Sequence, residues 1–475
     1  SFLSLCVGNE LGGSNWDEAD RIVKAMKDYD DRMLHYFCSA RKIVPGDDLT
    51  LTHRDPNRQV TIRERLFPYT DWDYENDYSQ TTRPTIAHEI GQWPVYPEFD
   101  ALLKKFDGVL RPWNIARLRE RAEKENTRRF EKEYHAASAA LSRLIYKEEV
   151  ESFLRTPSCA GVQLLSVQDY TGQGEALVGW RDPFYELKRA YIGKPAFNTI
   201  WGEKTYLARF KKYDWVVGET FTAKLFFRNL GAVPLPAGTP FPWVCGGRRG
   251  EVRASAPIAP GAVAELGLVS VPVTTAMTKG KQTLTFGVNS WNFWAYPVEG
   301  KCVWPEGLVV TTDFAEMRQA VSEGKTVLYT GVSRMCENGT FKPVYWSSNW
   351  FPTRYPLRSH LGTWFNAAHP AFAGFVTGDF TDWQWYDLTQ GVRIHRLTGL
   401  PDGFRPMGLS VNDFHFSMLA ATLFELKIGK GRLVVCGYDL EKDTPAAKRL
   451  RASLADYVAA KPADGTVGVD IAWLA

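Results

Sequence analysis

Short apolar segments alternate with amphipathic segments through the first 200 residues of the chain. The apolar segments are residues 2–7, 33–40, 49–53, 85–88 and 160–167. Each is too short for a buried helix and is typical of a parallel strand that is buried on both faces. Helical periodicity covers residues 16–30 and 113–155. This alternation predicts an α/β architecture, and strands that end in polar residues suit the last five strands of a (β/α)₈ TIM barrel.

The pattern changes beyond about residue 203, where helical periodicity stops. Apolar and polar positions now alternate within the segments 220–229, 262–273 and 281–288, and Pro and Gly lie between them. Strict alternation is typical of strands with one buried face. We therefore expect an immunoglobulin-like β-sandwich in this part of the chain.

From about residue 306, apolar segments again alternate with helical patterns, at 314–323, 416–426 and 445–459. This indicates an α/β domain of the flavodoxin or amidotransferase type. The chain is thus predicted to be multidomain: the C-terminal part of a barrel over residues 1–203, a β-sandwich over 204–303 and an α/β domain over 304–475. A length of 475 residues agrees with several separate cores.

Composition excludes some classes of partner. The 57 basic and 54 acidic residues give a net charge of +3 without a basic block, so nucleic acid is not an expected partner. No apolar segment approaches the roughly 18 residues that span a bilayer, so no membrane span is expected. The seven cysteines form no CxxC pair, and the sequence predicts neither a metal site nor a cofactor.

Two glutamates follow predicted strands at positions that suit catalysis. Glu10 ends the first strand and Glu89 ends the fourth, with two strand-like segments between them. Hydrolysis of a glycosidic bond with retention requires two carboxyl groups about 5 Å apart, one protonated and one ionised. If these strands are barrel strands four and seven, their ends converge across the mouth of the barrel.

The residues around these glutamates resemble glycoside hydrolase family 2, in its β-galactosidase-like bacterial multidomain form. The matching phrases are Gly8-Asn9-Glu10, TRPTIAHEIGQWPVYPEFD (82–100) and AGVQLLSVQDYTGQGEALVGW (160–180). The resemblance implies that Glu10 is the general acid/base, that Glu89 is the nucleophile, and that Asn9 binds the sugar 2-hydroxyl. It also implies that the sandwich and the α/β domain are accessory domains.

Other polar and aromatic residues near the predicted strand ends are candidates for substrate binding. These candidates are His53, His88, Trp93, Gln168, Asp169 and Gln173, with Trp72 and Tyr78 as weaker ones. Trp93 is expected to form a hydrophobic wall for the nonreducing sugar. The aromatic clusters at 291–297 and 382–388 are interpreted as packing between domains.

These features together predict a retaining exo-β-glycosidase that hydrolyses terminal sugars of plant or algal oligosaccharides by double displacement. β-Glucuronidase or another family 2 specificity is an alternative, and so is a non-catalytic carbohydrate-binding or assembly protein. Because a complete barrel takes about 250 residues, we expect an N-terminal part of the same protein, or a separate chain, to complete it. Formation of a homo-oligomer is a further possibility. The resemblance implies a periplasmic or secreted bacterial protein, with a signal peptide before residue 1.

Overall fold

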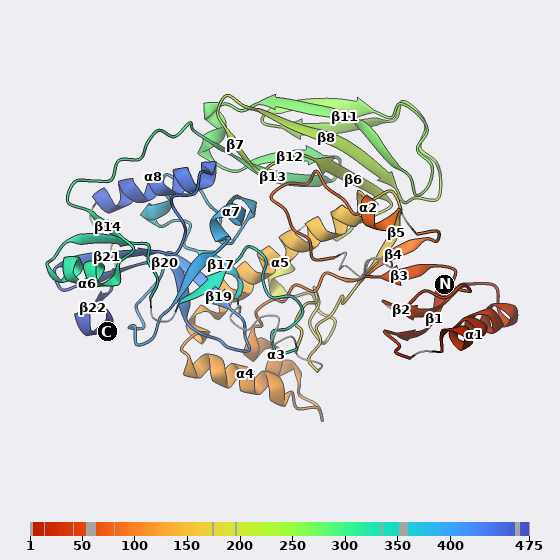
Figure 1. The fold of residues 1–475 in the computed structure, drawn as a ribbon, viewed down its shortest axis with the longest axis horizontal. Coiled ribbons are helices and arrows are strands. Elements are labelled where there is room, and N and C mark those ends of the chain that lie inside the picture. The colour runs from red at the N-terminus through yellow and green to blue at the C-terminus, as the bar shows by residue number, and fades with distance from the viewer. Residues whose placement is uncertain are drawn as a thin grey trace.

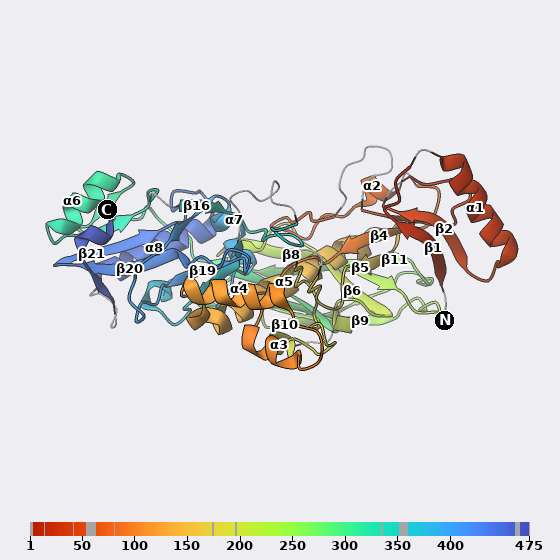
Figure 2. The ribbon, with the colours of Figure 1, turned by 90° about the horizontal axis from the view of Figure 1, so that it is seen from below.

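The computed structural model describes residues 3–13, 15–40, 42–53, 63–79, 81–172, 175–194, 197–333, 336–350, 360–460 and 466–474. Figure 1 shows the N-terminal strands at one end of an elongated molecule and the C-terminal elements at the other. A β-rich layer lies along one side, and the long helix α5 (Glu131–Leu154) runs through the middle. The view from below in Figure 2 shows that the molecule is thin compared with its length.

Five parallel strands form a curled, half-barrel-like sheet near the N-terminus. They are β1 (Ser4–Asn9), β2 (Leu34–Ser39), β3 (Thr50–Thr52), β4 (Thr85–Ile90) and β5 (Cys159–Leu164). β1 pairs with β2, and β3, β4 and β5 pair in that order, all in parallel. The Ala40 N–H donates to the Leu51 carbonyl oxygen at 2.8 Å and joins the two groups. The carboxyl ends of all five strands therefore lie along one rim.

Helices connect these strands, and one of them differs from the sequence prediction. α1 (Trp16–Tyr29) begins after Asn15, whose side chain accepts the Glu18 N–H. The predicted helix at 113–155 is divided into α4 (Trp113–Lys124), the 3₁₀ turn η1 (Arg128–Phe130) and α5. The break follows from Asn126, whose backbone is left-handed with φ of 55° and which ends α4. The shorter helices are α2 (Glu75–Tyr78) and α3 (Phe99–Lys105).

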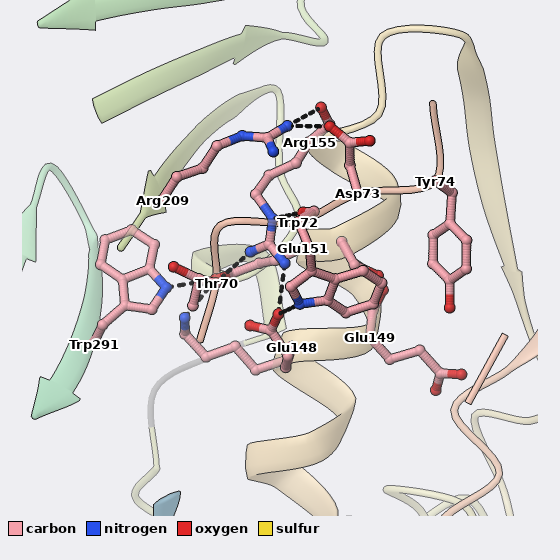
Figure 3. A network of polar contacts seen from close by, with 12 residues as sticks. Thr70, Trp72, Asp73, Tyr74, Glu148, Glu149, Glu151, Arg155, Arg209 and Trp291 are labelled. Atoms are coloured by element: carbon pink, nitrogen blue, oxygen red, sulfur yellow. Dashed lines mark hydrogen bonds and ion pairs between the residues drawn. The ribbon is translucent and has the colours of Figure 1, made fainter. Parts of the chain in front are cut away.

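Helix α5 is buried between the other layers and carries three buried glutamates that join it to its neighbours; Figure 3 shows the contacts of Glu148 and Glu151. Glu148 accepts a hydrogen bond from Trp72 Nε1 at 2.9 Å and one from Arg155 Nη2 at 2.5 Å. Glu151 accepts one from Trp291 Nε1, at 2.8 Å, across the border with the β-rich layer. These bonds tie α5 to the segment around Trp72 and to strand β13 of the β-rich layer.

Residues 204–296 form two facing sheets. One has the order β11–β8–β6, from Val263–Pro272, Thr220–Asn229 and Lys204–Arg209. The other has the order β10–β9–β12–β13–β7, from Arg248–Arg253, Pro240–Cys245, Gln282–Phe286, Asn289–Tyr296 and Asp214–Val216. Phe221 of β8 stacks on Phe293 of β13, with ring centroids 4.1 Å apart. Apolar side chains from both sheets thus share one core.

Residues 308–474, called the C-terminal unit below, are built on a mixed sheet. Its strands are β14 (Val309–Thr311), β15 (Thr326–Tyr329), β16 (Cys336–Gly339), β17 (His360–Phe365), β18 (Val392–Arg396), β19 (Gly408–Asn412), β20 (Ala420–Ile428), β21 (Gly431–Cys436) and β22 (Gly468–Val469). Its helices include α6 (Phe314–Ser322), α7 (Tyr386–Thr389) and α8 (Pro445–Ala459). A flavodoxin-like sheet would be parallel, but β20 runs antiparallel to β21.

The helix predicted at 416–426 is wrong, because this segment contains most of strand β20. Its residues Ala420–Leu426 are buried in succession, and the strand pairs with β21 and with β18 and β19. A strand in the middle of a covered sheet is apolar on both faces, so its sequence lacks the alternation that distinguishes a strand from a buried helix.

Strand β1 is an edge strand with an apolar exposed face. Leu3, Leu5 and Val7 are exposed, and a hollow of about 490 Å³ lies beside them, lined by Leu5 and by apolar residues of α1 such as Ile22. No helix among the described residues combines the length and apolar character that crossing a membrane needs.

Candidate active site

A cavity of about 740 Å³ opens at the carboxyl ends of the parallel strands. Its lining combines carboxylates, imidazoles, amides and aromatic rings. The lining includes Asn9, Glu10, Tyr36, Ser39, His53, Arg63, Glu64, His88, Glu89, Gln92, Gln163, Tyr170, Trp346 and Trp350. Concave sites with convergent polar groups are where small molecules are bound and transformed.

The two glutamates predicted as catalytic both line this cavity. Glu10 directly follows β1, and Glu89 is the penultimate residue of β4. Both have left-handed backbones, with φ of 50° for Glu10 and 53° for Glu89. Such conformations are costly for residues other than glycine and cluster at functional sites. His53 lies between the carboxylates: its Nε2 is 3.9 Å from Glu10 Oε1 and its Nδ1 is 4.0 Å from Glu89 Oε2. The fold thus brings both carboxylates to one imidazole.

A chain of hydrogen bonds crosses the floor of the cavity. His88 Nδ1 lies 2.5 Å from Gln163 Oε1, and His88 Nε2 lies 3.1 Å from Asn9 Oδ1. The Ser39 hydroxyl donates to Asn9 Oδ1. The His88 ring stacks on His53 at 5.6 Å between centroids. Four strands therefore contribute to one connected polar surface.

Positive groups hold Glu89 in its charged form. Arg63 Nη1 is 3.4 Å from Glu89 Oε2, and His88 Nε2 is 3.3 Å from Glu89 Oε1. Burial by itself would raise the pKa of Glu89, but the hydrogen bond from His88 and the charges of His88, Arg63 and His53 outweigh it and lower this pKa to about 2. The side chain of Glu89 is 18% exposed and that of Glu10 is 37% exposed. The two carboxylates therefore have different surroundings.

The backbone after Glu89 is fixed from below by α5. Glu149 Oε2 accepts the Gly91 N–H and Trp93 Nε1–H, both at 2.9 Å. Gly91 has φ of 79°, and a Cβ there would lie 2.3 Å from the Tyr146 ring, so only glycine fits. This anchorage holds the left-handed turn that presents Glu89 to the cavity.

The remaining predicted binding residues are not brought to the cavity. Trp93 is fully buried beneath it and does not form a wall. Asp169 pairs with Lys188 at 2.7 Å and Gln168 forms a backbone bridge with Arg181, so neither lines the cavity. Trp72 and Tyr78 are buried in the core. Gln173 lies outside the described residues.

Several lining residues have no signal in the sequence analysis. Arg63 lies eleven positions after Thr52, the last residue of β3. Gln163 lies inside β5, and Trp346 and Trp350 belong to the C-terminal unit. The alternation of β5 could have shown that Gln163 is on the same face as its neighbours two residues away. The two tryptophans lie more than 250 residues after Glu89 in the sequence, so only the tertiary structure shows that they line the same cavity.

One group in the described residues has the composition of a metal site. His53, His88 and Glu89 each offer a ligand atom, and these atoms lie within 4.8 Å of one another. In the structure, however, His88 Nε2 is directed at Asn9 and Glu89, so metal binding would compete with these contacts.

A buried ionic cluster joins Glu175, in the N-terminal part of the chain, to the C-terminal unit and should make stability depend on pH. His415 Nδ1 is 2.8 Å from Asp413 Oδ1, and its Nε2 is 3.3 Å from Glu175 Oε2. Burial by itself would lower the pKa of His415, but the charge and hydrogen bond of Asp413, with those of Glu175, raise it to about 9. A raised folded-state pKa stabilises fully below the ordinary value of about 6.5, and this contribution is lost as the pH rises through about 9.

We therefore predict that the melting temperature falls between pH 7 and pH 9.5, and that His415→Gln flattens this fall. At about 1.4 kcal/mol per pKa unit, the effect is on the order of 2–3 kcal/mol. Thermal unfolding by circular dichroism at several pH values measures it. An equally steep fall in the variant would assign the pH dependence to other groups.

Comparison with known proteins adds the following. A family model described as a domain of unknown function (DUF8487) matches residues 308–475. No curated protein matches the chain. Among solved structures, a β-glucuronidase of Bacteroides uniformis is 9% identical, with a TM-score of 0.22, over 66% of this chain and 36% of that one. A β-glucuronidase from glycoside hydrolase family 2 is 13% identical, with a TM-score of 0.20, over 65% and 28%.

The sporulation control protein Spo0M of Bacillus subtilis is 13% identical, with a TM-score of 0.15, over 20% of this chain and 49% of that one. The chain thus spans less than half of the length of each of these proteins. The structural similarity to family 2 β-glucuronidases is weak, and TM-scores this low carry no argument about activity.

Proposed function

We propose that this chain carries the two catalytic carboxylates of a retaining exo-β-glycosidase of the family 2 type. The observation that supports this best is the convergence of Glu10 and Glu89 on His53 in one polar cavity at the strand ends. Retention requires a closely placed pair with different protonation. Arg63 and His88 supply the positive surroundings that an ionised nucleophile needs.

In this mechanism Glu89 attacks the anomeric carbon and Glu10 donates a proton to the leaving oxygen, so that a covalent glycosyl-enzyme forms. Glu10 then removes a proton from water, which attacks the same carbon and releases Glu89. Asn9, which is held by Ser39 and His88, would bind the sugar hydroxyl next to the reacting carbon. The substrates would be terminal β-linked sugars of plant or algal oligosaccharides.

The proposal extends to the rest of the protein. Strands β1–β5 would be the last five strands of a (β/α)₈ barrel. Among the described strands β1 pairs with β2 alone, and its open edge favours pairing with a further strand, from the same polypeptide or from another chain. A periplasmic or secreted location suits a polysaccharide-degrading enzyme. Specificity for a galactoside or for a glucuronide is left to experiment.

A panel of aryl β-glycosides, including galactoside and glucuronide, tests the activity. The full-length protein should hydrolyse at least one of them, and Glu89→Gln, which keeps the size of the side chain, should not. The non-catalytic alternative predicts that sugars bind but are not cleaved. Equal release of aryl alcohol by both proteins would remove the catalytic proposal.

A further inference from the structure

The catalytic cavity is not made by the barrel segment alone. Trp346 and Trp350 of the C-terminal unit line it together with Glu10 and Glu89. The other apolar lining residues include Leu51 of β3, Leu164 of β5 and Leu165, which follows β5. The C-terminal unit therefore takes part in the site instead of lying apart from it.

Three polar contacts fix the segment that carries these tryptophans to residues around the cavity. The Tyr345 hydroxyl donates to the Glu89 carbonyl oxygen at 3.0 Å, and the Trp346 N–H donates to the Gln92 carbonyl oxygen at 2.8 Å. Lys342 Nζ is 2.9 Å from Glu64 Oε2. The position of this segment is thus coupled to the turn that presents Glu89.

A second anchor holds the next residues. Asn349 Nδ2 donates to Glu175 Oε2 at 3.4 Å, and the same carboxylate pairs with His415. The Trp346 ring packs edge to face on Tyr170 at 5.1 Å. These contacts hold the residues that precede Trp350, and a segment that is already held in place loses less entropy when a ligand binds.

The exposed surface of Trp350 distinguishes it from Trp346, the other tryptophan of the segment. It is 49% exposed, whereas Trp346 is buried. The side chain of Glu89 is more enclosed than that of Glu10, so the more open part of the cavity lies toward Glu10, which would face the leaving oxygen. An exposed indole on the rim of the cavity can stack its flat face on the apolar face of a sugar ring that lies outside the enclosed region around Glu89.

We propose that the C-terminal unit supplies the leaving-group side of the site, and that Trp350 binds the sugar ring attached to the leaving oxygen. The ligand is thus the second sugar of a β-linked oligosaccharide. This inference rests on the proposed glycosidase function, since the leaving side is defined by Glu10.

Two classes of substrate with the same terminal sugar separate this role from catalysis. A β-glycosyl fluoride has a leaving group that does not reach Trp350, whereas an oligosaccharide does. For Trp350→Ala, the kcat/KM for the oligosaccharide should fall roughly 10- to 100-fold, mainly through KM, as for a buried aromatic contact. Fluoride hydrolysis should stay within about twofold, and Trp350→Phe should retain most of the activity on the oligosaccharide.

Trp113→Ala is the matched control, because Trp113 is 76% exposed on α4 and does not line the cavity. It should leave both substrates unchanged. If Trp350→Ala lowers both substrates equally, or neither, the subsite proposal is wrong while the glycosidase proposal stands. If the unaltered protein hydrolyses no fluoride and no oligosaccharide, the glycosidase proposal fails and the subsite fails with it.

Discussion

Glu89→Ala is expected to lower the turnover of β-glycosides by about 10⁴-fold or more, because it removes the atom that forms the covalent intermediate. The pKa of Glu89, lowered to about 2, keeps its carboxylate ionised near neutral pH. Loss of the carboxylate also leaves a space on the face of the sugar from which Glu89 attacks. Steady-state hydrolysis of an aryl glycoside measures the loss.

Azide tests the roles of the two glutamates separately. With Glu89→Ala, azide should attack from the vacated face and give the α-glycosyl azide in one displacement. With Glu10→Ala, activated aryl glycosides should still glycosylate Glu89, and azide should then release the product with retained β configuration. Substrates with poor leaving groups should suffer far more in the Glu10 variant, because they need its proton.

Product configuration by NMR decides between these assignments. A β-azide from the Glu89 variant and an α-azide from the Glu10 variant would exchange the two roles. Glu18→Ala is a suitable control, because Glu18 is a surface residue of α1 paired with Arg21 and does not line the cavity. It should show no rescue by azide and no loss of turnover.

Arg155→Leu is expected to lower the free energy of unfolding by about 3–5 kcal/mol, the usual cost of leaving a buried charge without its partner. Arg155 and Glu148 are both buried, and their ion pair is 2.5 Å long. Arg155 Nε also donates to the Trp72 carbonyl oxygen at 3.1 Å. The variant would leave Glu148 buried with only Trp72 Nε1 as a donor. Urea unfolding followed by tryptophan fluorescence measures the change.

The double variant Arg155→Leu with Glu148→Leu separates the ion pair from general packing. Because both charges are then absent, part of the lost stability should return. Arg21→Ala, which breaks the exposed pair with Glu18, should leave the unfolding midpoint nearly unchanged. An unchanged unfolding midpoint for Arg155→Leu would mean that the buried network of Figure 3 does not hold these layers together.

The cavity residues that could be predicted are those that follow strands directly. Asn9, Glu10, His53, His88 and Glu89 each lie at the end of a short apolar segment and all line the cavity. Trp93 is a neighbour of Glu89 in sequence, yet the turn at Gly91 directs its side chain into the core against α5. Proximity in sequence does not determine which side of a turn a side chain takes.

The sequence by itself determined the order of the parallel strands and the location of polar residues at their ends, because these depend on local hydrophobic patterns. Only the tertiary structure decided that Arg63 neutralises Glu89, that Gln163 orients His88, and that Trp350 reaches the cavity. These contacts join segments separated by 26 to more than 250 residues. The curvature of the sheet and the packing of α5 create them, and neither leaves a periodic signal in the sequence.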